Sequence, residues 1–154
     1  TIMENLPLFL AYLGMAVMLA MSCIGSTLGV TIGGNATIAG LKKNPDMFGS
    51  AMLLCVLPST QGLYGFAGFF LMLNKLKEMA DVLTLNQGLA MCAAGLGLGI
   101  VGWYSAMRQS NLVANGINEI SNGQDVFGKT MILAVFPELY AILAFACAFL
   151  ALPA

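Results

Sequence analysis

The feature that most constrains the fold is a series of four long apolar runs separated by short polar breaks. The runs occupy residues 8–40, 47–73, 85–117 and 126–152. A helix needs about 20 residues to cross the apolar core of a bilayer, and each run is longer than that. None of the runs shows the two-residue alternation of a membrane-spanning strand. The sequence therefore predicts an all-α membrane protein with four transmembrane helices.

The charge content supports this class and excludes others. Only 8% of the 154 residues are charged, whereas soluble domains average about 25%. The formal net charge of −1 offers no basic surface for nucleic acid. The absence of histidine excludes a histidine-based metal site or catalytic triad. We therefore expect no catalysis by this chain alone and no nucleic-acid partner.

The four cysteines all lie inside apolar runs. None forms a C-x-x-C pair of the kind that binds zinc. We interpret them as small core hydrophobes, and they are Cys23, Cys55, Cys92 and Cys147.

The chain repeats itself at an offset of 79 residues. The segment Asp46-Met47-Phe48-Gly49 matches Asp125-Val126-Phe127-Gly128, and Pro58 matches Pro137. The repeat predicts a duplicated helical hairpin, with residues 1–79 as the first hairpin and 80–154 as the second, in parallel orientation.

Glycines recur every four residues in the first and third runs. They are Gly25, Gly29 and Gly33, then Gly95 and Gly99. Small residues at this spacing let helix backbones approach closely in lipid. The spacing fits packing within one four-helix bundle, and equally the crowded inner wall of a ring of copies.

One carboxylate lies deep inside an apolar run. Six of the seven acidic residues are at ends or in loops, but Glu138 is near the middle of the fourth run. A charge at that depth costs about 2.5 kcal/mol or more, so it indicates a functional site. The alternative is a buried neutral acid, or one paired with Arg108. Pro58 and Pro137 each free a backbone oxygen at a similar depth.

A polar face accompanies this carboxylate. Its members on the second run stand at i, i+3, i+4 and i+7, and they are Leu57, Thr60, Gln61 and Tyr64. The repeat places Thr60 level with Glu138, and Gln109 of the third run falls at a similar depth. Hydroxyl, amide and carboxylate oxygens suit a hard cation. A polar clasp between helices is the alternative for the two glutamines.

Two segments resemble a known family. Pro58-Ser59-Thr60-Gln61-Gly62-Leu63-Tyr64-Gly65-Phe66 and Pro137-Glu138-Leu139-Tyr140-Ala141-Ile142-Leu143 are similar to the proteolipid (c or K) subunit of bacterial V-type ATPases, most of all its sodium-pumping members. The resemblance covers essentially the whole chain. It implies a homo-oligomeric rotor ring in the cell membrane, turned through a central stalk by ATP hydrolysis on other subunits.

The resemblance also implies an ion site and partners. Its Na⁺ ligands would be the side chains of Glu138, Thr60, Gln61 and Gln109 and the carbonyl of Leu57, with Tyr64 hydrogen-bonded to Glu138. A stator subunit would offer a positive residue that pairs with Glu138 and displaces the ion. Lipid would surround the ring.

The family's orientation agrees with a weak charge bias. Lys42, Lys43 and Lys129 flank the loops at 41–46 and 119–125, which favours the cytoplasmic side for both loops. The loops would then face the central stalk, and the termini would lie on the extracytoplasmic side.

Three other functions stay open at this point: a ring that carries only H⁺, a free-standing four-helix channel or transporter, and a structural tetraspan protein. One residue departs from the family pattern. Arg108 precedes Gln109, and because adjacent helical residues point about 100° apart, we predict that Arg108 points away from the site.

Overall fold

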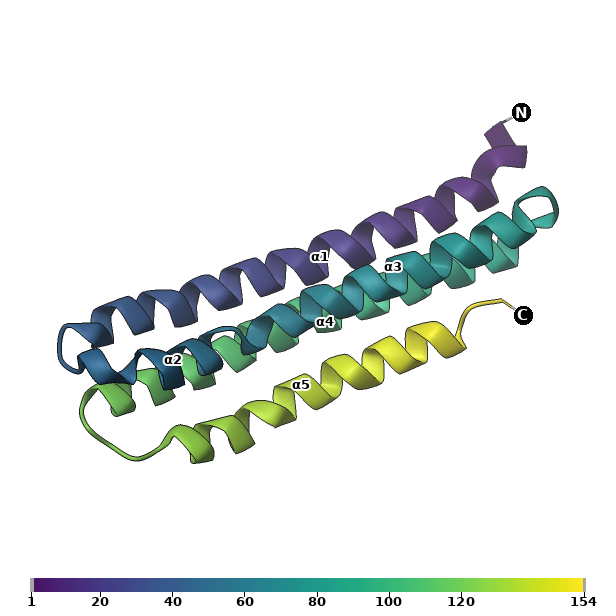
Figure 1. Cartoon of the computed structure of the whole chain (residues 1–154). Helices are drawn as coiled ribbons and strands as arrows, with labels where there is room; N and C mark the ends of the chain where they lie inside the picture. Colours follow the sequence, from purple (N-terminus) through teal and green to yellow (C-terminus); the bar gives the residue numbers. More distant parts are fainter. Residues whose placement is uncertain (1, 154) are drawn as a thin grey trace.

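The structure is a computed structural model that describes residues 2–153. Four long helical segments pack side by side in one elongated bundle, with both termini at the same end (Figure 1). The second of these segments consists of α2 and α3. The α-helices are α1 (Ile2–Leu41), α2 (Phe48–Cys55), α3 (Thr60–Met79), α4 (Leu85–Ser121) and α5 (Phe127–Leu150). Short 3₁₀ segments are η1 (Pro45–Met47), η2 (Leu57–Ser59) and η3 (Ala80–Val82). No strand occurs in the described residues, so the prediction of an all-α fold is confirmed.

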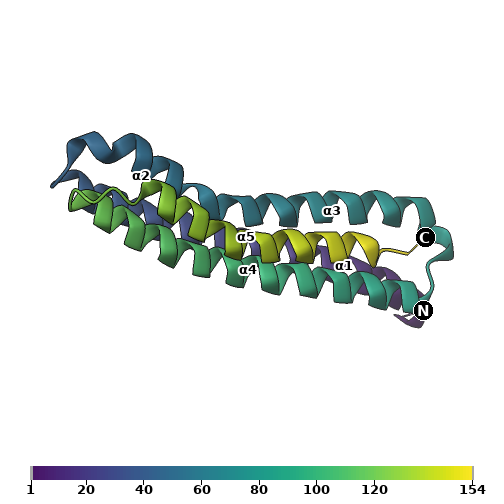
Figure 2. The same cartoon turned by 90° about the horizontal axis from the view of Figure 1, so that it is seen from below.

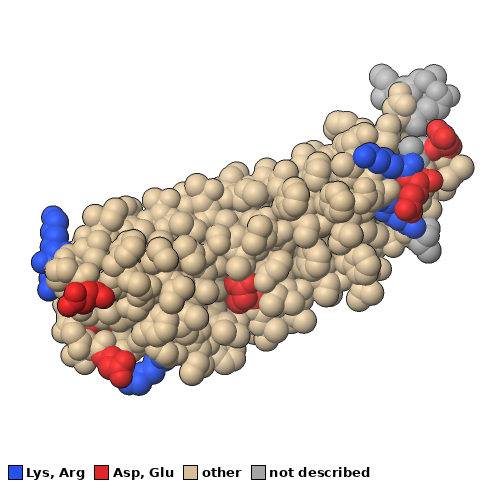
Figure 3. All heavy atoms as spheres, in the orientation of Figure 1, with Lys and Arg blue, Asp and Glu red and all other residues tan. Residues whose placement is uncertain are grey.

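Four stretches are long and apolar enough to cross a membrane. They are Asn5–Leu41, Pro45–Met79, Leu85–Ser121 and Phe127–Leu150. Charged side chains gather at the two ends of the molecule, with one acidic patch midway along the face in Figure 3. The long outer surface carries apolar side chains, as expected where lipid or neighbouring copies cover a helix.

The second span is not one continuous helix: it is interrupted at Pro58, one of the two prolines for which the sequence predicts a freed backbone oxygen. The α-helix ends at Cys55, the 3₁₀ turn η2 contains Pro58, and α3 begins at Thr60. Proline has no N–H for an α-helical bond, and the chain instead closes a tighter turn from the Ser59 N–H to the Val56 carbonyl (3.0 Å). Figure 2 shows the resulting offset between α2 and α3. The equivalent Pro137 lies within an unbroken α5.

Two helix ends also differ from the predicted boundaries. α3 continues to Met79, so the segment from Asn74 onward is helical rather than a connection. α4 extends to Ser121, which shortens the turn before α5. Both segments are polar, but they protrude as helical stems beyond the apolar depth of the bundle.

The glycine-rich faces pack α1 against α4. A Cβ on Gly25 would stand 2.5 Å from the Cα of Trp103, and a Cβ on Gly95 would collide with the backbone of Gly14. Gly33 faces Cys55 of α2 instead. These glycines therefore serve close packing inside one chain, the first of the two roles that their spacing allowed.

Two apolar clusters fill the bundle on either side of its middle. Near the termini the buried side chains include Met15, Met18, Met72 and Met91, and near the opposite end they include Leu54 and Ile117. The polar residues of the candidate site lie in the layer between the clusters. At the loop end, Lys43 Nζ donates to Asn122 Oδ1 (3.1 Å), which ties the two turns of that end together.

The cysteines divide by exposure. Cys55 is buried and Cys92 is half-buried, but Cys23 and Cys147 are exposed on the surface of the chain. The interpretation of all four as core residues was therefore wrong for these two. Helical periodicity turns both of them outward, and an apolar composition alone does not separate a core face from a lipid-facing one.

Candidate ion-binding site

The carboxylate of Glu138 is surrounded by hydrogen-bond donors from two other helices. Its Oε2 accepts from Thr60 Oγ1 (2.7 Å) and Gln61 Nε2 (3.2 Å) on α3. The same oxygen accepts from Gln109 Nε2 on α4 (2.9 Å). Its Oε1 accepts from the hydroxyl of Tyr64 (2.6 Å). The structure thus brings five of the six predicted site residues into direct contact around one half-buried carboxyl group.

The sixth residue, Leu57, enters through its backbone. The Thr60 hydroxyl lies 2.9 Å from the Leu57 carbonyl oxygen and 2.7 Å from Glu138 Oε2, and its single hydrogen can be donated to either. That carbonyl also accepts from the backbone N–H of Thr60, within the 3₁₀ turn between Cys55 and Thr60. The break at Pro58 therefore places a backbone oxygen beside the hydroxyl that bonds the carboxylate.

The two glutamines are the most deeply buried members of the site. Gln61 is 0% exposed and Gln109 is 1% exposed. Gln61 Nε2 donates to Gln109 Oε1 (3.0 Å), and Gln109 Nε2 donates to the backbone carbonyl of Ala134 (2.9 Å). The polar clasp between helices is therefore present, and it shares its atoms with the surroundings of Glu138.

Two contacts of this region involve groups that the sequence analysis did not name. One is the Ala134 carbonyl: Pro137 predicts a free backbone oxygen near this depth, on Leu133, and Gln109 bonds the next one along the chain. The other is Ser26 of α1, whose hydroxyl accepts from the backbone N–H of Gly62 at 2.7 Å. Ser26 holds the first turn of α3 against α1, but its place beside Gly25 gave no indication of this.

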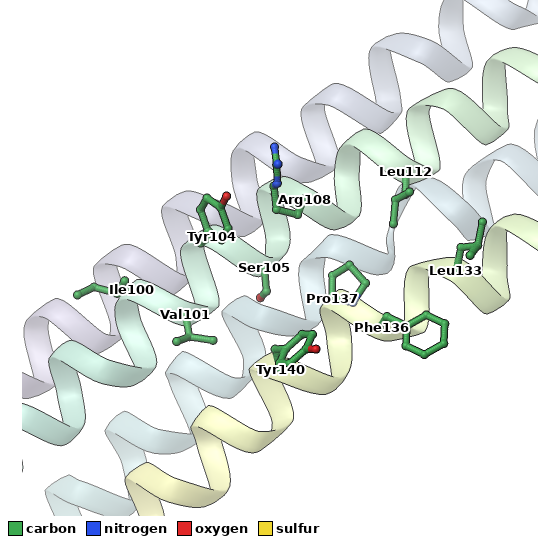
Figure 4. A pocket seen from close by; sticks show the side chains of 10 residues that line it. All are labelled: Ile100, Val101, Tyr104, Ser105, Arg108, Leu112, Leu133, Phe136, Pro137 and Tyr140. Atoms are coloured by element: carbon green, nitrogen blue, oxygen red, sulfur yellow. The ribbon is translucent and has the colours of Figure 1, made fainter.

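Arg108 points away from the site, as predicted. Its side chain is exposed, and its guanidinium carbon lies 5.5 Å from the centre of the Tyr104 ring. No ion pair joins Arg108 to Glu138 in the described part of the chain, so the alternative of a buried acid–base pair is wrong. Figure 4 shows Arg108 on the wall of a groove between α4 and α5.

The donor set fits a single monovalent cation. Within residues 2–153, no group of three or more His, Cys, Asp or Glu side chains comes together to hold a metal. One carboxylate with neutral hydroxyl, amide and carbonyl oxygens offers one negative charge, which a monovalent ion neutralises at a depth where net charge is costly. The Tyr64 ring packs on Phe145, with centroids 6.0 Å apart, on one side of this set.

Two parallel membrane hairpins with one carboxylate held in a polar layer at mid-depth define a membrane proteolipid. The chain belongs to the family of ATP synthase C subunits, whose pattern matches it twice, at residues 13–72 and 92–151. The double match confirms the duplication; the boundary between residues 79 and 80 stays a prediction.

Two relatives extend over most of the chain. The K subunit of the V-type sodium ATPase of Enterococcus hirae is 37% identical over 150 residues, covering 97% of this chain and 94% of the relative. The K subunit of the A-type ATP synthase of Methanocaldococcus jannaschii is 34% identical over 136 residues, covering 88% of this chain and 58% of the relative.

The family settles the class of function. The chain is a proteolipid rotor subunit of the V/A-type ATPases, a multi-pass membrane protein that forms a ring of identical subunits and has no catalytic role of its own. The alternatives of a free-standing channel and of a structural tetraspan protein do not fit this membership. The identity of the transported ion is a separate question.

Proposed function

We propose that this protein binds Na⁺ at Glu138 and carries it across the cell membrane as the ring turns. The observation that supports this most is the burial of two amide side chains against the carboxylate. Binding a proton needs only the carboxyl group, whereas Gln61 and Gln109 add two buried amide groups whose oxygens can ligate a hard cation. The relative from Enterococcus hirae, part of a sodium ATPase by name, supports the same ion.

The proposed ligands are the oxygens of Thr60, Gln61, Gln109 and Glu138 and the carbonyl of Leu57. In the present arrangement both amides donate N–H groups to Glu138. An amide carries its oxygen and its NH₂ on the same planar group, so a half-turn exchanges them. Entry of the cation would turn amide oxygens toward it, and the carboxylate would exchange neutral donors for the ion.

Tyr64 has a different role in this proposal. Its hydroxyl bonds Oε1 of Glu138, the oxygen that no other site residue contacts, and thereby holds the carboxylate in place. Tyr64 is a positioning residue rather than an ion ligand.

The transport cycle follows from charge. With Na⁺ bound, the Glu138 site is neutral and crosses lipid at low cost. A stator subunit with a positive residue would then pair with Glu138 and displace the ion toward its exit.

The orientation of the ring is part of the proposal. The 41–46 and 119–125 loops would contact the central stalk on the cytoplasmic side, with the termini outside. The hydrogen bond between Lys43 and Asn122 supports a common docking surface. A thiol introduced by Gln124→Cys should react with an impermeant maleimide in inverted vesicles and not in intact cells; labelling in intact cells would reverse the orientation.

Carbodiimide labelling of Glu138 in the purified ring tests the choice of ion. Such reagents attack a protonated, accessible carboxyl group. At fixed pH, Na⁺ at millimolar or lower concentration should protect Glu138, whereas K⁺ should not. If only raising the pH protects it, the ring carries H⁺ and the glutamines are a clasp. Glu138→Gln should abolish labelling, which shows that the loop carboxylates do not contribute.

A further inference from the structure

A long groove runs between α4 and α5 on a face that no other helix of the chain covers. Its middle part has a volume of about 670 Å³, and Arg108, Tyr104 and Tyr140 lie on its walls (Figure 4). Val101 also lines a second hollow, of about 470 Å³, with small residues along α4. Leu112 and Leu133 also line a third hollow, of about 270 Å³, toward the loops. The shared residues make the three hollows one continuous surface.

The internal repeat identifies what this groove corresponds to. The repeat has an offset of 79, so each α1 residue that packs on α4 has an equivalent 79 positions later. These equivalents are residues of α4 that line the groove. The pairs are Gly14 with Ala93, Met21 with Ile100, Ser22 with Val101, Gly25 with Tyr104 and Gly29 with Arg108. In the first hairpin this surface is filled by α4. In the second hairpin the same surface is empty.

The complementary surface exists on the other side of the chain. Each α4 residue that packs on α1 has an equivalent 79 positions earlier in the chain. These equivalents lie on α1, and all of them are exposed. The pairs are Met91 with Tyr12, Gly95 with Ala16, Gly102 with Cys23, Trp103 with Ile24 and Ala106 with Thr27. The chain thus presents two unpartnered surfaces that match the two halves of its own α1–α4 contact.

The ring of identical subunits brings these two surfaces together between neighbouring copies, and within that contact we propose that Arg108 of one copy bonds Thr27 and Thr31 of the next. The two surfaces are formed by different residues, exposed ones on α1 and those lining the α4–α5 groove, so each copy can use one for each neighbour. Such a head-to-tail contact closes into a ring when the rotation permits. The assignment rests on the ring assembly of the family and not on which ion is carried.

The role of Arg108 follows from a difference between the two hairpins. Where the first hairpin has Gly25 and Gly29, the second has Tyr104 and Arg108. A Cβ on Gly29 would stand 3.2 Å from the Ala106 carbonyl, and the equivalent carbonyl in a second copy belongs to Thr27. The contact between copies must therefore be wider than the contact within a chain, with the Arg108 side chain filling the difference.

The chemistry of the two faces matches. Arg108 has five N–H donors and, in the isolated chain, contacts the Tyr104 ring. The Thr27 hydroxyl donates to the Cys23 carbonyl (2.8 Å), and the Thr31 hydroxyl donates to the Thr27 carbonyl (2.8 Å). Because each hydroxyl donates its hydrogen to a backbone carbonyl, the lone pairs of its oxygen can accept hydrogen bonds from the guanidinium group of Arg108. A charge exposed within a membrane-spanning helix needs such partners.

Disulfide cross-linking tests the docking surface. Within the chain, a Cβ on Gly102 would be 3.2 Å from Ser22 Cβ, and the equivalent pair between copies is the native Cys23 with residue 101. A disulfide needs Cβ atoms about 3.5–4.5 Å apart, which the wider contact supplies. Val101→Cys, with Cys55, Cys92 and Cys147 replaced by alanine, should form a ladder of covalent multimers on mild oxidation of the ring, and reduction should collapse it.

Two further variants keep this test decisive. Ile132→Cys in the same background exposes a thiol at another depth and should stay monomeric on a denaturing gel. The double variant Ala16→Cys with Ala93→Cys tests a second point of the same contact, the equivalent of Gly95 with Gly14. It should form the same ladder even if position 101 does not tolerate cysteine. Intact rings that give no ladder with either pair would overturn the docking surface.

The Arg108 contact has its own readout. Arg108→Ala should lower the temperature at which the ring dissociates into single subunits on a native gel. The double variant Thr27→Val with Thr31→Val should do the same, and combining all three changes should add little, because one interaction is removed in both cases. Lys129→Ala is the control and should leave the temperature unchanged. Rings of Arg108→Ala that are as stable as the parent would refute the contact. If Na⁺ fails to protect Glu138 from carbodiimide, the proposed ion is wrong, but the cross-linking and the ring-stability results are unaffected.

Discussion

The two oxygens of Glu138 have unequal surroundings. Oε2 accepts three hydrogen bonds from Thr60, Gln61 and Gln109, while Oε1 accepts one from Tyr64. The site therefore has a side where a cation can replace donors and a side where one tyrosine holds the carboxylate.

Removing the Tyr64 hydroxyl tests this division. In Tyr64→Phe we expect the Na⁺ concentration that half-protects Glu138 from carbodiimide to rise about tenfold. A hydrogen bond to a charged group contributes about 1.5–3 kcal/mol, and 1.4 kcal/mol corresponds to a factor of ten. Tyr12→Phe is the matched control, because Tyr12 lies on α1 outside the Glu138 site. An unchanged Na⁺ requirement in Tyr64→Phe would show that Tyr64 does not position the carboxylate.

Residue types predicted most of the site, but not its backbone. The depth of Glu138, set by counting from the repeat, aligned it with Thr60, and the structure brings these two side chains into contact. The helical spacing that grouped Leu57 with Thr60 assumed a continuous helix, yet Pro58 interrupts it. Leu57 joins the group through its carbonyl oxygen, which belongs to the 3₁₀ turn and lies 2.9 Å from the Thr60 hydroxyl.

At the scale of elements, the close approach of α1 and α4 is what sets the shape of the bundle. These two helices run parallel and make the most extensive contact in the chain. The approach depends on glycines, since a Cβ on Gly95 would collide with the backbone carbonyl of Gly14. A backbone cannot move aside as a flexible side chain can.

Gly95→Ala should therefore destabilise the protein. Overpacking of this kind costs about 1–3 kcal/mol, so we expect a lower thermal midpoint in detergent, measured by circular dichroism. Gly49→Ala provides the comparison, because a Cβ at Gly49 in α2 meets nothing within 4 Å. Alanine is the better helix former, so Gly49→Ala should be neutral or stabilising by about 0.5–1 kcal/mol. A Gly95→Ala protein as stable as the parent would mean that α1 and α4 can separate without loss.

The number and order of the helices followed from the apolar runs, and Pro58 marked the position of the break, whereas the ends of the helices did not follow. Hydropathy predicts which residues lie within the membrane. It does not predict where a helix ends when polar residues continue it beyond the membrane, as those from Asn74 to Met79 do. The two prolines at equivalent positions also behave differently. α5 stays continuous through Pro137, where Gln109 bonds the Ala134 carbonyl, but the second span breaks at Pro58.

At the scale of the whole molecule, duplication creates two equivalent clefts, of which only one contains a carboxylate and amide side chains. The residues that correspond to Thr60, Gln61, Tyr64, Gln109 and Glu138 are Leu139, Tyr140, Leu143, Val30 and Ser59. The second cleft, which forms between copies, thus has no carboxylate and no amide. Fewer ions then cross for each turn of the ring, so a fixed amount of ATP can drive each charge against a steeper gradient, at about 2.3 kcal/mol per charge for every 100 mV.

A ring of this chain should therefore bind one Na⁺ per copy, which is one per four helices. Equilibrium binding of radioactive ²²Na⁺ to the purified ring, divided by the number of copies counted by native mass spectrometry, measures this ratio. Glu138→Gln should bring it to zero, because the remaining oxygens are neutral and offset no charge in the membrane. Ser59→Ala should leave it at one, because the second cleft contributes no site. A ratio of two in the parent ring would mean that the cleft between copies binds an ion without a carboxylate, against the charge argument on which the Glu138 site depends.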